Sequence, residues 1–299
     1  MLLSLSTPAI FAQEGRTNAE LALRALREGF PERVGEIGFA DGDWRVDVGG
    51  RLFYWASGRL LPAGERHQPE RYGSRSFYSI PLRPQAPEEL SPQQITGLRE
   101  RGSGGARIAR PDVHDAFTAA LYGGNTRVQI EALQKQVVFL GHQVTVHTFL
   151  IEALKSVERE IRAWKGGAAF IAGIDTVQGY NWRQIAGTRR LSFHSLGVAI
   201  DILPKNQDGK PVYWMWEQQR NPDWMLVPLQ ARWNPPPEVI DIFRKHGFIW
   251  GGNWTLFDNI HFEYRPELLA YTRLLAENSD RGGGDSFHHV YPDGMPDRQ

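Results

Sequence analysis

Apolar positions in the first third of this 299-residue chain change from a helical to a strand-like spacing. Residues 17–30 carry apolar side chains three and four positions apart, which predicts an amphipathic helix. Residues 34–61 fall into short alternating runs separated by glycines, which predicts small β-hairpins. Pro, Arg, Gly and Ser dominate residues 62–110, so we expect loops there, with one short helix at 91–100.

Helical spacing returns after residue 110 and gives way to a second strand-rich part. Helices are predicted over residues 112–123, 128–141, 144–164, 236–247 and 265–277. Strands are predicted over residues 168–174, 198–204 and 259–264, with a polar loop at 179–197. Residues 205–237 are an unusual insertion that holds six prolines and four tryptophans, Trp214, Trp216, Trp224 and Trp233.

The order of these elements predicts an α+β fold, a small antiparallel sheet with flanking helices preceded by a helical and hairpin N-terminal region. We divide the chain into an accessory region of unknown role at 13–110, a main domain at 111–278 and a loose tail at 279–299. Residues 1–12 are uncharged and mostly apolar, and resemble the hydrophobic part and cleavage site of a secretory signal. They are interpreted as a signal remnant, which predicts an extracytoplasmic protein, periplasmic or secreted.

Composition excludes several classes of protein. The 34 basic and 34 acidic residues cancel, which argues against a nucleic-acid-binding protein that relies on bulk positive charge. No run reaches about 18 apolar residues, so no transmembrane segment is expected. The chain has no cysteine, so any metal must be held by His, Asp or Glu. We expect a monomer.

The first candidate site lies in the string SFHSLGVAIDI, residues 192–202. His194 and Asp201 are seven positions apart, which would place them on opposite faces of an unbroken strand. Gly197 can supply the bend that removes this difficulty. Asp201 is a single carboxylate among apolar strand residues, and a buried carboxylate needs a cation, a metal or several donors. The alternative is a structural carboxylate paired with a nearby arginine.

The second cluster is the string DNIHFEY at residues 258–264. Strand alternation places His261 and Glu263 on one face, and Asp258 lies in the turn before them. By itself this pattern favours a polar edge strand. Together, however, the two clusters supply two histidines and one carboxylate as ligands, with a further carboxylate beside them. A catalytic zinc site requires three protein ligands, an open position for water, and a base nearby.

These strings resemble the motifs of one family. SFHSLGVAIDI resembles the S-x-H-x-x-G-x-A-x-D motif of the zinc D-alanyl-D-alanine carboxypeptidase family, which includes the L-alanyl-D-glutamate endopeptidases of phages and bacteria. GGNWTLFDNIHFEY resembles the second motif, and YNWRQIAGTRRLS is similar to the segment that approaches the first. The resemblance covers residues 130–275 and implies a fold shared with hedgehog-type and lysostaphin-type domains, here with a zinc site carried by the small sheet.

The resemblance implies a role for each matching residue. His194, Asp201 and His261 would be the zinc ligands. Asp258 would be the general base, at a position where carboxypeptidase members often carry Glu and the L-alanyl-D-glutamate type often carries Asp. Glu263 is the rival for this role because it shares the strand face of His261.

Two further roles follow from the same resemblance. Ser192 would hold the substrate backbone or the first histidine. A cationic residue would bind a substrate carboxylate or stabilise the oxyanion; Arg183 is the first candidate, and Arg189 and Arg190 compete with it.

The implied function is zinc-dependent hydrolysis of a peptide bond in peptidoglycan stem peptides, with water activated by zinc and an Asp base. The Asp at the base position favours an endopeptidase over a D-Ala-D-Ala carboxypeptidase. A non-catalytic relative that only binds the cell wall is the third possibility. The insertion at 205–237 either walls the substrate groove or packs as a separate apolar cluster.

Overall fold

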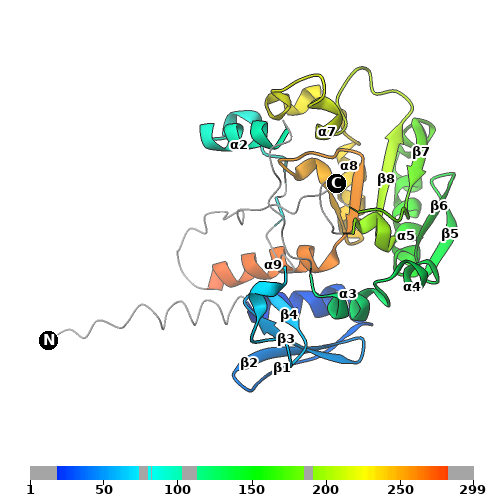
Figure 1. The fold of residues 1–299 in the computed structure, drawn as a ribbon. Helices are drawn as coiled ribbons and strands as arrows, with labels where there is room; N and C mark the ends of the chain where they lie inside the picture. Colours follow the sequence, from blue (N-terminus) through cyan, green and yellow to red (C-terminus); the bar gives the residue numbers. More distant parts are fainter. Residues whose placement is uncertain (1–18, 74–79, 82, 103–112, 185–190, 282–299) are drawn as a thin grey trace. The chain divides into compact units, whose positions relative to one another are not determined.

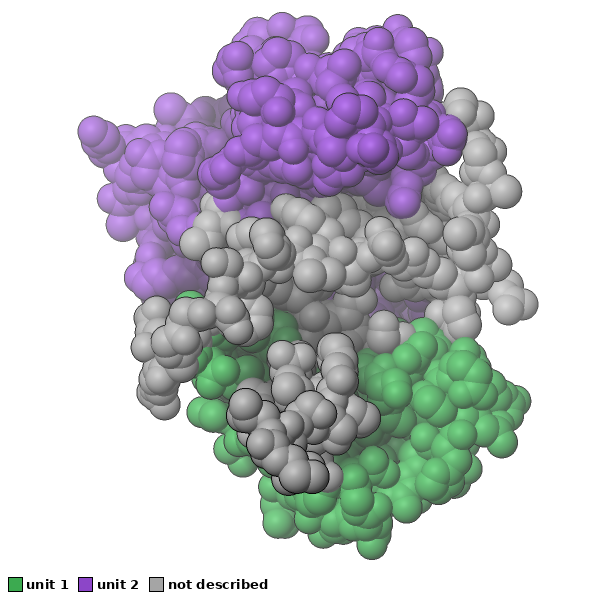
Figure 2. Space-filling view, turned by 90° about the vertical axis from the view of Figure 1, so that its left-hand side faces the viewer, with its two compact units in different colours: residues 1–79, 110–125, 266–296 green, residues 80–109, 126–265, 297–299 purple. Residues whose placement is uncertain are grey.

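The computed structural model describes residues 19–73, 80–81, 83–102, 113–184 and 191–281 (Figure 1). The predicted signal remnant, Arg189, Arg190 and most of the predicted tail lie outside these ranges. The chain divides into two compact units, which Figure 2 colours separately. Unit 1 contains residues 1–79, 110–125 and 266–296, and unit 2 contains residues 80–109, 126–265 and 297–299. Within the described ranges, no helix is long and apolar enough to cross a membrane.

Unit 1 combines helices with an antiparallel sheet in which each strand pairs with the next along the chain, β1-β2-β3-β4. This order confirms the hairpins predicted over residues 34–61. Residues 19–29 are helical, as predicted for the described part of 17–30. The labelled elements are β1 Val34–Ala40, β2 Asp43–Val48, β3 Arg51–Ala56, β4 Arg59–Leu61, α3 Asp115–Tyr122 and α9 Pro266–Arg281.

The first helix of unit 1 packs closely against α9. Leu21 and Ala25 of that helix share an apolar cluster with Tyr271 and Leu274 of α9. Gly29 permits the close approach, because a Cβ atom there would lie 2.5 Å from the main-chain nitrogen of Glu267.

Unit 2 carries a second antiparallel sheet with the order β7-β8-β10-β9. Its labelled elements are α2 Pro92–Gly102, α4 Arg127–Glu131, β5 Gln134–Phe139, β6 His142–His147, α5 Ile151–Ala163, α6 Gly167–Ala172, β7 Ile174–Gln178, β8 Ala199–Pro204, α7 Trp214–Glu217, α8 Pro237–Lys245, β9 Phe248–Trp250 and β10 His261–Tyr264. Helix α8 packs on the sheet, where the ring of Phe243 stacks 4.0 Å from that of Phe262. The predicted α+β class with a small antiparallel sheet and flanking helices is confirmed.

Two segments of unit 2 differ from the sequence prediction. The helices expected over 128–141 and 144–164 are interrupted by the hairpin of β5 and β6, so that only α4 and α5 remain helical. Leu140 and Gly141 form the turn with φ of 52° and 89°, the positive angles that a two-residue hairpin loop requires. The strand expected over 168–174 is wrong as well, because α6 occupies most of it and β7 begins only at its last residue.

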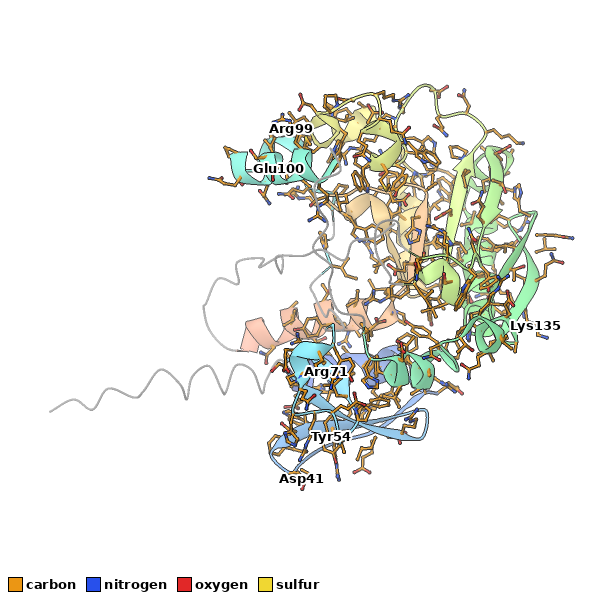
Figure 3. All side chains as sticks on the ribbon, viewed as in Figure 1. Asp41, Tyr54, Arg71, Arg99, Glu100 and Lys135 are labelled. Atoms are coloured by element: carbon orange, nitrogen blue, oxygen red, sulfur yellow. The ribbon has the colours of Figure 1, made fainter. Side chains whose placement is uncertain are left out.

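The insertion at 205–237 forms an apolar cluster of its own. Trp214 and Trp224 are 1% and 0% exposed, with ring centroids 4.9 Å apart, and the ring of Phe257 packs against the second. On α2, Arg99, which Figure 3 labels, donates a 3.0 Å hydrogen bond from Nε to Asp223 of the insertion. The aromatic core of the insertion is therefore packed structure, whereas the side chains of Trp216 and Leu226, 48% and 38% exposed, lie at its surface.

Candidate functional site

Strand pairing brings the two histidine motifs together. In the antiparallel pair of β8 and β10, Asp201 lies directly opposite His261. His194 lies in the short 3₁₀ helix Phe193–Leu196, which leads into β8. Gly197 ends this helix with φ of 69°, a left-handed angle that suits glycine. This turn is the bend that lets His194 approach Asp201 despite their spacing of seven.

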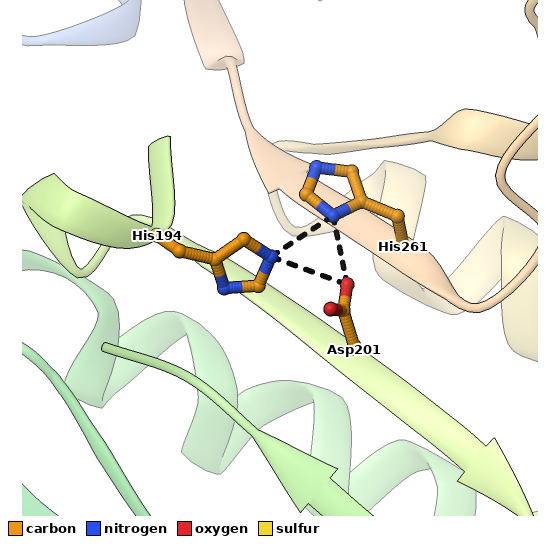
Figure 4. Close-up of side chains that lie close together, drawn as sticks. All are labelled: His194, Asp201 and His261. Atoms are coloured by element: carbon orange, nitrogen blue, oxygen red, sulfur yellow. Dashed lines mark hydrogen bonds and ion pairs between the residues drawn. The ribbon is translucent and has the colours of Figure 1, made fainter. Parts of the chain in front are cut away.

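The side chains of His194, Asp201 and His261 converge, as Figure 4 shows. The Oδ1 atom of Asp201 lies 2.8 Å from Nδ1 of His261 and 3.2 Å from Nε2 of His194. The two histidine nitrogens lie 3.2 Å apart, and one donor atom of each residue falls within 4.8 Å of the others. Two imidazole nitrogens and a carboxylate oxygen form a donor set that suits zinc. The residues present therefore fit a bound zinc ion.

A main-chain carbonyl sets the orientation of the first histidine. Nδ1 of His194 lies 2.7 Å from the carbonyl oxygen of Gly179, to which it donates when protonated. The proton then sits on Nδ1, and the lone pair of Nε2 faces Asp201 and His261. Gly179 is tightly enclosed, because a Cβ atom there would overlap the carbonyl oxygen of Thr145 and lie 2.7 Å from Cγ2 of Val144.

The charges of the cluster shift the pKa values of its members. Burial alone would lower the pKa of His194, but the charge of Asp201 and hydrogen bonds to Asp201 and Gly179 outweigh it and raise that pKa. Burial opposes ionisation of Asp201, but the two histidines hold its pKa far below the ordinary value. Asp201 is therefore an anion at neutral pH, which is the form that binds a cation.

Asp258 lies beside this cluster without belonging to the converging set. Its side chain is 3% exposed, and its Oδ1 atom has no hydrogen-bond partner among the described residues. Burial raises the pKa of Asp258 well above its ordinary value, and the negative charge of Asp201 adds to the increase, whereas Arg183 opposes it. A carboxyl group with a raised pKa can take up and release a proton near neutral pH.

Ser192 and Arg183 lie on the approach to His194. The Oγ atom of Ser192 caps the short helix by accepting a hydrogen bond of 3.3 Å from the main-chain nitrogen of His194. Arg183 is half-buried, and its main-chain nitrogen donates a 2.8 Å bond to Oγ of Ser195. Its positive charge influences the pKa values of both His194 and Asp258, which places it near the site. The competing Arg189 and Arg190 lie outside the described residues.

Glu263 is wholly buried in β10, opposite Ala199 of β8 and Ile249 of β9. Its Oε1 atom lies 3.9 Å from Nη1 of Arg265, whose guanidinium group lies 5.0 Å from the ring of Phe193. A buried carboxylate with a neighbouring arginine is typical of a structural ion pair.

The residues that hold the loop and the ring of His194 by hydrogen bonds were not predicted from the sequence. Gln134 donates from Nε2 to the carbonyl oxygen of Leu196 at 3.3 Å. The hydroxyl group of Ser195 accepts the hydrogen bond from the main chain of Arg183, and the carbonyl oxygen of Gly179 bonds to the ring of His194. Gly179 is the first residue of the polar loop expected at 179–197, which was a signal for it, but the residue type of Gln134 carries no comparable signal.

Comparisons with known proteins agree with the position of the site. Residues 186–264 match the family model described as D-alanyl-D-alanine carboxypeptidase, and residues 22–77 match a domain of unknown function, DUF8518. The chain is 34% identical over 80 residues to the peptidoglycan L-alanyl-D-glutamate endopeptidase CwlK of Bacillus subtilis (strain 168). That match covers 25% of this chain and 40% of the relative, so the chain spans less than half the relative's length. No solved structure matches the chain. Residues 186–264, with both histidine motifs, therefore resemble the D-alanyl-D-alanine carboxypeptidase family, and a peptidoglycan peptidase is among the relatives of this region.

Proposed function

We propose that this protein hydrolyses a peptide bond in peptidoglycan stem peptides, with zinc held by His194, Asp201 and His261. The convergence of one donor atom from each of these residues is the observation that carries the proposal. Asp258, a buried carboxyl group close to the three, supplies the base that such a reaction needs. The relative CwlK is named as a peptidoglycan peptidase, which supports the same substrate class.

The reaction divides among the side chains of the site. Zinc, when bound, supplies a Lewis acid that makes water nucleophilic near neutral pH. Asp258 accepts the proton of that water at its unpartnered Oδ1 atom and returns it to the leaving amine, and its raised pKa suits both steps. Arg183 supplies positive charge to the oxyanion or to a substrate carboxylate. Ser192 holds the main chain of His194, so that the first ligand stays in place.

We favour an endopeptidase that cuts the L-alanyl-D-glutamate bond. An aspartate occupies the base position, and the relative CwlK carries that activity in its name. A pair of substrates separates this activity from that of a carboxypeptidase, one with a free D-Ala-D-Ala end and one with that end amidated. An endopeptidase cleaves both. Cleavage confined to the free acid, with D-Ala as the only product, would establish the carboxypeptidase instead.

Mass spectrometry of peptidoglycan fragments after incubation with the zinc-loaded protein tests the proposal as a whole. Release of peptides that begin with D-glutamate is the expected result. Binding to peptidoglycan without any new fragment would favour the non-catalytic alternative. An extracytoplasmic location, where intact peptidoglycan lies, stays a prediction.

A further inference from the structure

The insertion pairs directly with the segment that carries Asp258. Tyr213 and Asp258 form an isolated antiparallel bridge. The main-chain nitrogen of Trp214 donates to Phe257 at 3.0 Å, and that of Asn259 donates to Val212 at 2.8 Å. These two bonds flank the bridge, so Tyr213 and Asp258 are a non-hydrogen-bonded pair. Side chains of such a pair point to the same face, with Cβ atoms about 4.5–5.5 Å apart.

Alternation along both segments directs neighbouring aromatic side chains away from the backbone on opposite sides. Trp214 and Phe257, one position away from the bridged pair, point to the opposite face, where Trp224 packs with them. Tyr213 instead shares the face of Asp258. The side chain of Tyr213 therefore leaves its segment on the same side as the carboxyl group proposed as the base, and its ring, only 7% exposed, packs with the buried tryptophans in one apolar cluster.

Trp216 extends this aromatic surface toward solvent. Its ring lies edge-to-face with that of Tyr213, with centroids 5.6 Å apart and planes at 80°. The hydroxyl group of Tyr213 donates to the sulfur of Met215 at 2.7 Å, which helps to hold the tyrosine ring against Trp216. Trp216 is 48% exposed, whereas the other tryptophans of the chain are buried or half-buried. An exposed indole that the apolar cluster does not use is typical of a binding surface.

We propose that Trp216, supported by the buried ring of Tyr213, forms a subsite that binds a sugar ring of the glycan to which the stem peptide is attached. This inference rests on the proposed function. The two residues named in the relative's bond, L-alanine and D-glutamate, offer a methyl group and a charge, and neither matches the face of an exposed indole ring. A pyranose ring instead presents a face of C–H bonds, whose partial positive charge suits the negative face of an aromatic ring. The preferred substrate is then a glycan-linked stem peptide.

Saccharide binding tests the subsite independently of catalysis. The probe is a peptidoglycan glycan strand freed of its peptides, titrated calorimetrically into the zinc-loaded protein. We expect Trp216→Ala to weaken binding about 3- to 10-fold, the range that aromatic contacts of this kind support. Leu226→Ala, which removes another exposed side chain of the insertion, 38% exposed, is the matched control and should bind like the unmodified protein. Equal binding by the Trp216 variant, or no binding by any form, would overturn the subsite.

Kinetics on two substrates supply the second readout. The unmodified protein should cleave a glycan-linked stem peptide with a lower KM than the free peptide, and Trp216→Ala should remove this difference by raising the first KM alone. An equal increase in KM for both substrates in Trp216→Ala would mean that Trp216 contacts the peptide, which would also overturn the sugar subsite. Failure to cleave either substrate would contradict the proposed function, while the saccharide titration would still decide the subsite.

Discussion

Replacement of Gly179 by alanine perturbs the metal site without touching a proposed ligand. The new Cβ atom would lie 2.7 Å from Cγ2 of Val144 and would overlap the carbonyl oxygen of Thr145. Ordinary van der Waals contact begins near 3.4 Å, so relief of the Val144 clash alone requires the Gly179 segment to move by about 0.7 Å, and the overlap with the Thr145 oxygen requires more. The same movement would stretch the 2.7 Å bond from His194 to the Gly179 carbonyl beyond the 3.2 Å limit of a good hydrogen bond.

The loss of this bond should weaken zinc binding. Groups that orient a metal-bound histidine typically contribute about 10- to 100-fold to metal affinity. We therefore expect Gly179→Ala to bind zinc about 10- to 100-fold more weakly than the unmodified protein, measured by competition with a chromophoric chelator.

Gly97→Ala is the matched control for this experiment. Gly97 lies on the exposed side of α2, and a Cβ atom there would meet nothing within 4 Å. Its zinc affinity should equal that of the unmodified protein. Equal zinc affinity in Gly179→Ala, with its far-ultraviolet circular dichroism preserved, would refute the orienting role of the Gly179 carbonyl.

Three further predictions follow from the charges of the site. Arg183→Ala should lower kcat/KM for stem peptides about 100-fold while zinc content stays the same, and an unchanged kcat/KM would transfer the role to another arginine. Metal-free protein should gain stability from His194 below its ordinary pKa of 6.5 and from Asp201 above its ordinary pKa of 3.8, because the first pKa is raised and the second lowered on folding. Its Tm should therefore fall as the pH rises from 6.5 through the raised pKa of His194. The variant His194→Ala should show no such fall in Tm. The same fall in that variant would exclude His194 as the cause. Glu263→Gln should lower Tm but keep most activity, and an inactive Glu263→Gln beside an active Asp258→Ala would reverse the two roles.

The site was predictable from the sequence to the extent that it depends on short motifs. His194 and Asp201 share one motif, and the Gly197 bend brings them together as expected. The pairing register of β8 and β10 could not be predicted, because nothing in either string specifies that Asp201 lies opposite His261. Pairing between distant strands depends on packing of the whole sheet, which no local pattern encodes.

The errors in the fold prediction have a physical cause. Residues 134–147 contain apolar side chains at spacings that fit both a helix and a strand, so periodicity alone does not reveal the hairpin. Gly141, which permits the hairpin turn, was the evidence against a continuous helix. For the insertion, composition could not separate a packed cluster from a substrate wall, because buried Trp214 and exposed Trp216 are two residues apart in one short helix.

Zinc content and peptide cleavage, measured on the same preparations, test the central claim most directly. The unmodified protein should contain one zinc ion and cleave glycan-linked stem peptides. Asp258→Ala should keep that zinc but lose activity about 10²- to 10⁴-fold, because a general base is separable from the metal ligands. His261→Ala should lose both zinc and activity. Full zinc occupancy in His261→Ala, or cleavage by Asp258→Ala at the unmodified rate, would contradict the account.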